Sequence, residues 1–337
     1  MSVNFVNKSD YIKLSKEFNT NPLQSYAWGQ IKKGNWYPDR LGIYKGSDIV
    51  ALVTILTRKI PLLNKKFGYI PRGISIKDKK LLPFVLEEIK KASSNLVISH
   101  IIVDPGVDFE SVFKDKQSNI KKIYESNRYK ETGRQEQPIR TVVIDLSKSE
   151  KELLSDMRSK HRQYIRKAGR NNVKVTKGND ENIDDFCRII DEIKKERNYT
   201  MHETDYYRKV WKFFREEGSA EIFVARVEKD IIGTYMIIFS DRNVYEMFGG
   251  CNKKGRNLLA NYALKWECIK YSKEIGKKFY DQWGAEHAHP GLVQFKEGFG
   301  GKVIKYPSQY TYVRDKVGYF IYKVSRRIRT VSSKLQL

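Results

Sequence analysis

An internal repeat constrains the fold of this sequence more than any other feature. Residues 41–56 read LGIYKGSDIVALVTIL, two β-rich runs separated by a short polar turn with Gly and Asp, a pattern that predicts a β-hairpin. Residues 223–239, FVARVEKDIIGTYMIIF, repeat the pattern, and Ile231 lies 182 residues after Ile49. In a chain of 337 residues this offset is close to half the length, which indicates a duplicated unit.

The segments that follow the two hairpins also correspond. Each hairpin is followed by a third strand (67–70 and 244–248), a helix (81–92 and 258–275), a strand (96–103 and 279–283), a further segment (124–129 and 293–299) and a last strand (140–144 and 309–313). This order predicts the α/β class with mixed sheets rather than a doubly wound parallel sheet, and it resembles the GNAT-type acyltransferase fold. We therefore expect two GNAT-like domains in tandem.

Charge and composition limit the function. With 64 Lys and Arg against 40 Asp and Glu, the net charge of +24 favours an anionic partner, such as nucleic acid, an anionic membrane surface or a phosphorylated substrate. The 40% hydrophobic and 12% aromatic content excludes a disordered chain. Apolar runs are too short for a membrane span, and the N-terminus lacks a secretory signal pattern, so we expect a cytoplasmic protein. Three cysteines without CxxC spacing argue against disulfides and thiolate zinc sites.

Five motifs occur together and in a fixed order. They are QSYAWGQIKKGNW (24–36), YIPRG (69–73), RSKHRQYIRKAGRNNV (158–173), GRNLLANYALKW (255–266) and GLVQFKEGFGG (291–301). Together they span nearly the whole chain and resemble the FemABX family of aminoacyl-tRNA-dependent peptidoglycan peptidyltransferases. The sequence has no sustained heptads between Asp184 and Ser219, so it resembles the short type without a coiled-coil arm.

The resemblance implies a domain plan and a reaction. Residues 1–148 with 314–337 would form the precursor-binding domain, with the C-terminal segment packing back on it, and residues 149–313 would carry catalysis and a basic helix facing tRNA. The enzyme would move an amino acid from aminoacyl-tRNA to the stem-peptide amine of lipid II or of UDP-muramyl-pentapeptide. It would act as a monomer, with aminoacyl-tRNA as co-substrate and no further cofactor.

Two basic helices are predicted. In 152–170, the residues Arg158, Arg162, Arg166 and Arg170 recur every four residues on one stripe, and no acid follows Asp156, which favours tRNA or anionic lipid over a plain solvated face. We expect His161 to belong to that surface. In 316–331, an apolar stripe that includes Val317, Phe320 and Val324 alternates with Lys and Arg. We expect the apolar stripe to pack on the first domain and the charges to face a membrane or tRNA. The protein would then be able to lie at the inner face of the membrane.

Substrate contacts are assigned to both domains. On a helix Lys32 projects one turn beyond Trp28, so its ammonium can reach a phosphate beside an apolar wall, and the resemblance implies that this Lys contacts the precursor's phosphate. We also place Arg72 of the YIPRG motif and Phe248 among the substrate-binding residues. In the second domain, His202 stands where family members can carry Arg, and Tyr206 matches a family Tyr. A His gives a weaker, pH-dependent contact to a diphosphate than the fork of an Arg.

Lys296 is the candidate for the chemistry. It stands between Phe295 and a glycine-rich turn, so its stem can be buried while its ammonium points into a cleft. Aminolysis of an ester develops negative charge on the carbonyl oxygen, and a cation held at that point stabilises the tetrahedral state. The alternative is a surface Lys at a turn.

A general base is less clearly marked. The attacking amine is mostly protonated at neutral pH, so a carboxylate or the substrate must take a proton. Asp104, in a Val-Asp-Pro-Gly turn, and Asp281, at the equivalent strand of the second copy, are the candidates, and we choose Asp104. Each is also the residue type expected at a turn or strand end. The run 286–289, EHAH, lacks a third nearby ligand, so we expect no metal site.

Two other classes of function stay open. A GNAT enzyme that uses acyl-CoA needs a pyrophosphate-binding loop before the helix, and both copies lack its run of glycines. A non-catalytic RNA-binding or membrane-surface protein would need only the positive charge, and Lys296 would then be dispensable.

Overall fold

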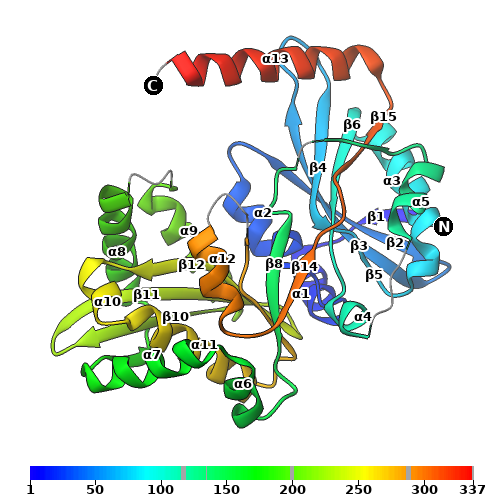
Figure 1. The fold of residues 1–337 in the computed structure, drawn as a ribbon. Helices are drawn as coiled ribbons and strands as arrows, with labels where there is room; N and C mark the ends of the chain where they lie inside the picture. Colours follow the sequence, from blue (N-terminus) through cyan, green and yellow to red (C-terminus); the bar gives the residue numbers. More distant parts are fainter. Residues whose placement is uncertain (115–118, 134, 198–200, 286–289, 336–337) are drawn as a thin grey trace. The chain divides into compact units, whose positions relative to one another are not determined.

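The computed structural model describes residues 1–337 except 115–118, 134, 198–200, 286–289 and 336–337. The chain divides into two compact units. Unit 1 comprises Met1–Gln137 and Tyr306–Leu337, and unit 2 comprises Pro138–Lys305. The C-terminal segment therefore returns to the first unit, as the sequence predicted (Figure 1).

Unit 1 is built on a mixed sheet with the strand order β1-β2-β3-β4-β6-β15-β7, and β5 pairs with β3. β4 and β6 are parallel, and the other neighbours are antiparallel. Its strands are β1 (Ser2–Phe5), β2 (Tyr37–Lys45), β3 (Asp48–Lys59), β4 (Lys66–Gly73), β5 (Ser75–Ile76), β6 (Ile98–Pro105), β7 (Lys130–Glu131) and β15 (Tyr310–Val313). Its helices are α1 (Lys8–Glu17), η1 (Pro22–Gln24), α2 (Tyr26–Lys32), η2 (Lys79–Leu81), α3 (Leu82–Asn95), α4 (Phe109–Phe113), α5 (Ile120–Ser126) and α13 (Lys316–Leu335).

Unit 2 repeats this plan with the strand order β14-β8-β13-β12-β11-β10-β9, in which β12 and β13 are the parallel pair. Its strands are β8 (Arg140–Asp145), β9 (Lys174–Lys177), β10 (Ala220–Val227), β11 (Asp230–Phe239), β12 (Asn243–Cys251), β13 (Phe279–Asp281) and β14 (Lys302–Lys305). Its helices are α6 (Glu150–Asp156), α7 (Ser159–Arg170), α8 (Asn182–Arg197), α9 (Thr204–Glu216), α10 (Lys253–Asn257), α11 (Ala260–Glu274) and α12 (Pro290–Glu297). These mixed sheets confirm the predicted fold class.

The hairpins of the two copies agree in detail. β2 and β3 pair Ile43 with Ala51 and then Tyr44 with Ile49, so one residue of β3 bulges out. β10 and β11 contain the same irregularity, since Ala225 pairs with Gly233 and the next pair is Arg226 with Ile231. Both bulges lie at the 182-residue offset that the sequence indicated. The duplication therefore extends to strand register.

Two strands belong to sheets other than those we predicted. The sequence assigned 140–144 to the first copy and 309–313 to the second. In the structure β8 pairs with β13 and β14, whereas β15 pairs with β6 and β7. The unit boundaries therefore follow Gln137 and Lys305 instead of residues 148 and 313. β8 pairs antiparallel with β13, and β15 pairs antiparallel with β6, and β13 and β6 occupy equivalent places in the two sheets. The local pattern of β8 or β15 therefore suits either sheet and does not select one.

The single basic helix expected over 152–170 is wrong, because the chain breaks at Met157. α6 ends at Asp156, and Met157 and Arg158 are extended, with ψ of 148° and 140°. The Arg158 N–H donates to the carbonyl of Gly298 at 2.9 Å, which holds the break in place. Arg158 therefore precedes α7 instead of lying on its stripe.

The C-terminal helix packs on unit 1 as expected, but the face that we expected to be buried is the wrong one. The apolar residues Val317, Phe320, Val324 and Ile328 of α13 are exposed to solvent. Another face packs on unit 1, where Tyr322 contacts the rings of Phe67 and His100 at 4.6 and 4.5 Å between centroids. Aromatic stacking therefore anchors this helix. Within the described part of the chain, no helix is long and apolar enough to cross a membrane.

Gln24 fills a gap in the first sheet. β3 pairs with β5 at Ala51 and Leu52 and with β4 from Leu56 onward, so its middle lacks a strand partner on that side. The fully buried Gln24 side chain accepts from the Thr54 N–H at 2.8 Å and donates to the Pro71 carbonyl at 2.7 Å. The next residue, Ser25, caps α2 by accepting from the Trp28 N–H. This contact thus sets where α2 begins.

We expect Gln24→Ala to destabilise unit 1 strongly. The substitution leaves the Thr54 N–H and the Pro71 carbonyl buried without partners, which costs about 2–4 kcal/mol of unfolding free energy. Chemical denaturation measures the effect, with the exposed Gln163→Ala on α7 as the matched control. Equal unfolding midpoints for the two variants would contradict the structural role of Gln24.

Candidate functional site

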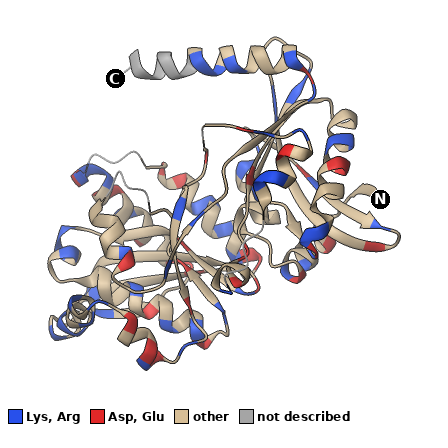
Figure 2. Cartoon of the chain, turned by 45° about the vertical axis from the view of Figure 1, so that its right-hand side comes forward, with Lys and Arg blue, Asp and Glu red and all other residues tan. Residues whose placement is uncertain are grey.

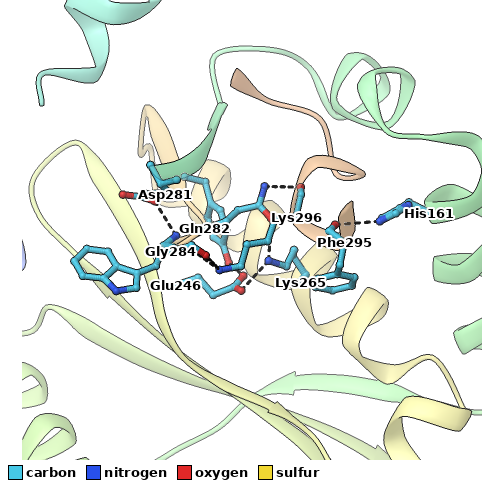
Figure 3. A network of polar contacts seen from close by, with 11 residues as sticks. His161, Glu246, Lys265, Asp281, Gln282, Gly284, Phe295 and Lys296 are labelled. Atoms are coloured by element: carbon cyan, nitrogen blue, oxygen red, sulfur yellow. Dashed lines mark hydrogen bonds and ion pairs between the residues drawn. The ribbon is translucent and has the colours of Figure 1, made fainter. Parts of the chain in front are cut away.

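Lys296 is buried in unit 2 with its ammonium held by a turn. The residue lies in the last turn of α12 and is 8% exposed. Its Nζ donates to the carbonyl of Gly284 at 2.6 Å and to the carbonyl of Trp283, both directly after β13 (Figure 3). An ammonium has three donors, and among the described residues only these two acceptors engage it. The third N–H has no partner among the described residues and is available to an oxygen of a substrate.

The surroundings of Lys296 make its charge labile. Burial, together with the nearby positive charge of Lys265, lowers its pKa to about 8. The negative charges of Glu246 and Asp281 act in the opposite direction. At neutral pH most molecules therefore carry the cation in a site from which water is largely excluded.

A second buried lysine, which the sequence analysis did not single out, supports this site. Lys265 of α11 is fully buried, and its Nζ donates to Glu246 at 2.7 Å and to Gln282 at 2.9 Å. Gln282 in turn donates to the carbonyl of Lys296 at 2.9 Å, and Glu246 accepts from the hydroxyl of Tyr280 at 2.6 Å (Figure 3). The available signal was a Lys on the same helix face as Cys268 and Ile269, where an apolar residue is expected.

Aromatic rings wall the site. Phe295 and Phe299 lie 5.1 and 5.4 Å from the Lys265 ammonium. His161 packs against both rings and pairs its Nε2 with the carbonyl of Phe295 at 3.1 Å. Burial lowers the pKa of His161. The expectation that His161 belongs to a basic surface is therefore wrong, because its ring is part of the wall.

The glycines after Lys296 are required by close packing. A Cβ on Gly298 would lie 2.0 Å from the ring of His161. Gly300 and Gly301 have φ of +81° and +96°, a region that side chains disfavour. The glycine-rich turn therefore lets the chain pass close to the wall and return into β14.

The two candidate bases are buried and hydrogen-bonded. In unit 1, Asp104 at the end of β6 accepts from the Tyr69 hydroxyl and from Gln309 at 3.1 Å, and burial raises the pKa of its carboxyl. In unit 2, Asp281 accepts from Thr141 and from the Trp283 N–H at 2.7 Å. Asp281 thus stabilises the turn whose carbonyls hold Lys296.

Unit 1 contains a cavity of about 330 Å³. Its wall combines aromatic and apolar side chains with cations. The lining residues are Trp28, Lys32, Trp36, Leu56, Arg58, Lys59, Pro61, Phe67, Tyr69, Ile102, Glu136, Gln137, Tyr322, Ser325 and Arg326. Such a lining suits a ligand with both apolar and anionic parts.

Lys32 lies in the lining of this cavity beside Trp28. Its ammonium lies 4.4 Å from the centre of the Trp28 ring, one turn along α2. Burial lowers its pKa. Tyr69 lines the same cavity and donates a hydrogen bond to Asp104. Trp28, Lys32 and Asp104, which were all selected from the sequence, are therefore connected in this part of unit 1.

Arg72 lies elsewhere in unit 1. It is buried, and its guanidinium stacks 3.4 Å from the ring centre of Tyr306. It is absent from the described lining of the cavity. Its contact with Tyr306 gives it a structural role at the point where the chain re-enters unit 1.

His202, Tyr206 and Phe248 form a ring cluster in unit 2. His202 and Tyr206 lie 3.9 Å apart, and Tyr206 lies 6.1 Å from Phe248, measured between ring centroids. Burial raises the pKa of Tyr206. The structure thus brings together the three residues that the sequence selected for the second domain.

The four arginines of the basic segment differ in their contacts. Arg158 lies 3.5 Å from a carboxylate oxygen of Glu297. Arg162 donates to the carbonyls of Leu154 at 3.2 Å, Ser155 and Met157, so it caps the end of α6. Arg166 and Arg170 are exposed, and neither forms an ion pair with a described residue.

The remaining prediction concerns a metal. Residues 286–289, which contain the two histidines of that motif, lie outside the described part of the chain. Among the described residues, no group of three His, Cys, Asp or Glu side chains is placed to hold a metal ion.

We expect the Lys296 ammonium to lose its proton near pH 8, and at a higher pH when its two charged neighbours are replaced with uncharged residues. The double variant Lys265→Met with Glu246→Gln removes the repelling cation together with its counter-ion, and without that cation the pKa of Lys296 should rise. NMR titration of ¹³C-labelled lysine side chains measures both values, and Lys296→Arg identifies the resonance. A Lys296 signal that titrates near pH 10.4, as in a free lysine, would contradict the burial of this charge.

The comparisons with known proteins agree with this architecture. The model of the FemAB family matches residues 7–231 and 227–327. The lipid II:glycine glycyltransferase of Staphylococcus haemolyticus is 21% identical over 91% of this chain and 89% of its own length. The enzyme of the same name from Staphylococcus aureus strain MRSA252 is 20% identical over 91% and 89%. The crystal structure of FemX superposes with a TM-score of 0.84 at 18% identity, over 95% of this chain and 99% of FemX. This chain belongs to the FemAB family.

Proposed function

We propose that this protein transfers an amino acid from aminoacyl-tRNA to the stem-peptide amine of a peptidoglycan precursor. The observation that carries the proposal is the Lys296 ammonium, which is buried in unit 2 and held by two backbone carbonyls, while no other described residue takes its third N–H. The names of the staphylococcal relatives support a peptidoglycan acceptor. The aminoacyl-tRNA donor follows from the motif resemblance and the positive charge.

The reaction needs a cation where the oxyanion forms. The amine attacks the ester carbonyl, an N–C bond forms, and the C–O bond to the tRNA ribose breaks as its oxygen takes a proton. Between these events the carbonyl oxygen carries negative charge, which the remaining N–H of Lys296 stabilises. A charge that is already in place and shielded from water stabilises such a state much better than a solvated one.

The amine must also lose protons. Tyr69 lines the cavity of unit 1 and donates to Asp104, and burial raises the pKa of Tyr69 well above its ordinary value. In the resting protein its phenol therefore stays protonated and donates to the Asp104 carboxylate. During the reaction the phenol would pass this proton to Asp104 as it takes one from the substrate amine. We propose Asp104 as a base that acts through Tyr69, and Asp281 as a positioning residue for the Trp283 turn.

The cavity of unit 1 supplies a site for the phosphate-bearing end of the precursor. Lys32 and Arg58 are both in its lining, beside the rings of Trp28 and Trp36. Cations next to aromatic walls match a diphosphate attached to a sugar or a base. We propose that Lys32 binds one phosphate of this group.

Transfer from acyl-CoA is the main alternative, and the segment before α11 argues against it. In acyl-CoA enzymes of this fold, free backbone N–H groups at this place would bind the pyrophosphate. Here α10 precedes α11, and the N–H groups of Leu258 and Leu259 donate to the carbonyls of Lys254 and Arg256 at 3.0 and 3.1 Å. Those donors are therefore occupied within the chain. A purely RNA-binding or membrane-surface protein would have no use for the buried Lys296 network.

We expect Lys296→Met to abolish the chemical step while the fold persists. Loss of one oxyanion donor lowers kcat by about 10²–10³. Lys296→Arg should restore little, because a planar fork on a longer stem displaces the charge. Single-turnover transfer, with substrate affinities measured in parallel, tests this, and Lys305→Met at the exposed end of β14 is the control. A Lys296→Met enzyme with wild-type turnover would show that another group stabilises the oxyanion.

We expect Lys32→Ala to weaken binding of the acceptor selectively. Removing one charge-assisted contact should raise KM for a diphosphate-bearing acceptor by about 1–3 kcal/mol in free energy and leave KM for aminoacyl-tRNA unchanged. Steady-state kinetics with intact and phosphate-free acceptors measures this, and the neighbouring, exposed Lys33→Ala is the matched control. Equal losses with both acceptors would exclude Lys32 as the phosphate ligand.

We expect the exposed arginines of α7 to bind the tRNA backbone. Replacing Arg166 and Arg170 with Gln should weaken tRNA binding and reduce the slope of log K against log salt by about 0.7–0.9 for each phosphate that is no longer neutralised. Arg188→Gln, on an arginine already paired with Asp185 and Glu192, is the control. An unchanged slope in the double variant would place the tRNA site elsewhere.

A further inference from the structure

Helix α13 exposes an apolar stripe. Val317, Phe320, Val324 and Ile328 are 65%, 63%, 40% and 61% exposed. Their spacing of three or four residues places them on one side of the helix, because each residue advances by about 100°. Such a continuous row of large apolar side chains in water indicates a binding surface.

The other side of α13 is already occupied. Tyr319 and Tyr322 pack on His100, at 4.8 and 4.5 Å between ring centroids. Tyr322, Ser325 and Arg326 line the cavity of unit 1. Rotating the helix to bury the stripe would break these contacts, so the described part of unit 1 leaves the stripe open to a partner.

Cations follow one edge of the stripe. Lys316, Lys323 and Arg327 are exposed and lie between the buried face and the apolar side chains. None of the three forms an ion pair with a described residue, and the sequence of α13 contains no Asp or Glu. Figure 2 shows Lys and Arg along this helix without acidic residues among them.

A protruding leucine lies near the start of the helix. Leu62, in the loop between β3 and β4, is 98% exposed. Lys65 of the same loop forms an ion pair with Asp315 at 2.6 Å, immediately before α13. The loop therefore adds a further apolar side chain at this end of unit 1.

We propose that α13 docks on the surface of an anionic phospholipid bilayer. The apolar stripe would enter the boundary between headgroups and acyl chains, and the three cations would meet lipid phosphates. A second copy of this chain fits the same face less well, because it would bring two rows of cations together on proteins that each carry a net charge of +24.

Docking would also select the acceptor. The cavity that we assign to the precursor lies against the opposite face of the same helix, whose diameter is about 10 Å, so a docked helix would hold that cavity at the membrane surface. We infer that the acceptor is lipid-linked rather than a free nucleotide. This step rests on the proposed function, whereas the docking itself does not.

Vesicle flotation tests the docking. Wild-type protein should float with vesicles of equal parts phosphatidylcholine and phosphatidylglycerol and bind those of phosphatidylcholine alone at least about tenfold more weakly. Phe320→Ser with Val324→Ser should lower binding by about tenfold or more. The matched control is Phe84→Ser with Val303→Ser, whose side chains are 60% and 45% exposed elsewhere. Circular dichroism verifies that each variant folds.

A charge-matched pair of variants separates local docking from net charge. Lys316→Gln, Lys323→Gln and Arg327→Gln together should abolish the preference for phosphatidylglycerol, whereas Lys160→Gln, Lys167→Gln and Arg170→Gln on α7 should keep it. Equal losses in the two triple variants would overturn the proposal. The proposal would also be overturned if the wild-type protein did not float with the vesicles. It would likewise be overturned if sedimentation showed a dimer that Phe320→Ser converts to a monomer.

The same apolar variant distinguishes the two proposals. Phe320→Ser with Val324→Ser should keep wild-type transfer to soluble UDP-muramyl-pentapeptide and lose about tenfold in transfer to lipid II in vesicles. Wild-type protein that floats but transfers to neither acceptor would contradict the proposed function and leave the docking intact. Equal rates of the variant on both acceptors would overturn the choice of a lipid-linked acceptor.

Discussion

Two buried ammonium groups in unit 2 determine how that unit is built. Lys265 and Lys296 share one interior, and their repulsion is offset by Glu246, Gln282 and the carbonyls that follow β13. Burying charge without such partners would be strongly unfavourable. The arrangement therefore demands the turn after β13, the close passage of the glycine-rich segment and the aromatic wall. A protein that needed only stability would place apolar side chains here, so the network points to chemistry.

The local patterns of the sequence predicted much of the fold. Both hairpins, their 182-residue offset and the contact of Lys32 with Trp28 follow from strand alternation, turn residues and helical spacing. The local patterns did not predict that β8 belongs to the second sheet and β15 to the first. Strand pairing depends on residues far apart in the sequence, and either sheet offers an equivalent place. The end of α6 depends on the contact of Arg158 with Gly298, which is 140 residues away in the sequence.

The site was predicted only in part, because its contacts also join residues that are far apart in the sequence. Lys296 stood out because aromatic residues and glycines flank it, but its partners come from α11, β12 and the end of β13, which no short motif unites. The buried face of helix α13 was predicted wrongly because two sides of the helix carry large apolar or aromatic side chains. Its tyrosines stack on unit 1, while the side that is richer in aliphatic residues remains exposed.

The central claim is that Lys296 stabilises the oxyanion of aminoacyl transfer. A crystal structure of the protein with a phosphonate analogue of the tetrahedral intermediate, which joins an aminoacyl-adenosine to a stem peptide, tests this most directly. The account predicts a phosphonate oxygen about 2.7–3.1 Å from Lys296 Nζ, with the ammonium still held by the carbonyls of Trp283 and Gly284. An analogue whose phosphonate oxygens contact other donors and lie beyond hydrogen-bond distance of Lys296 would contradict it.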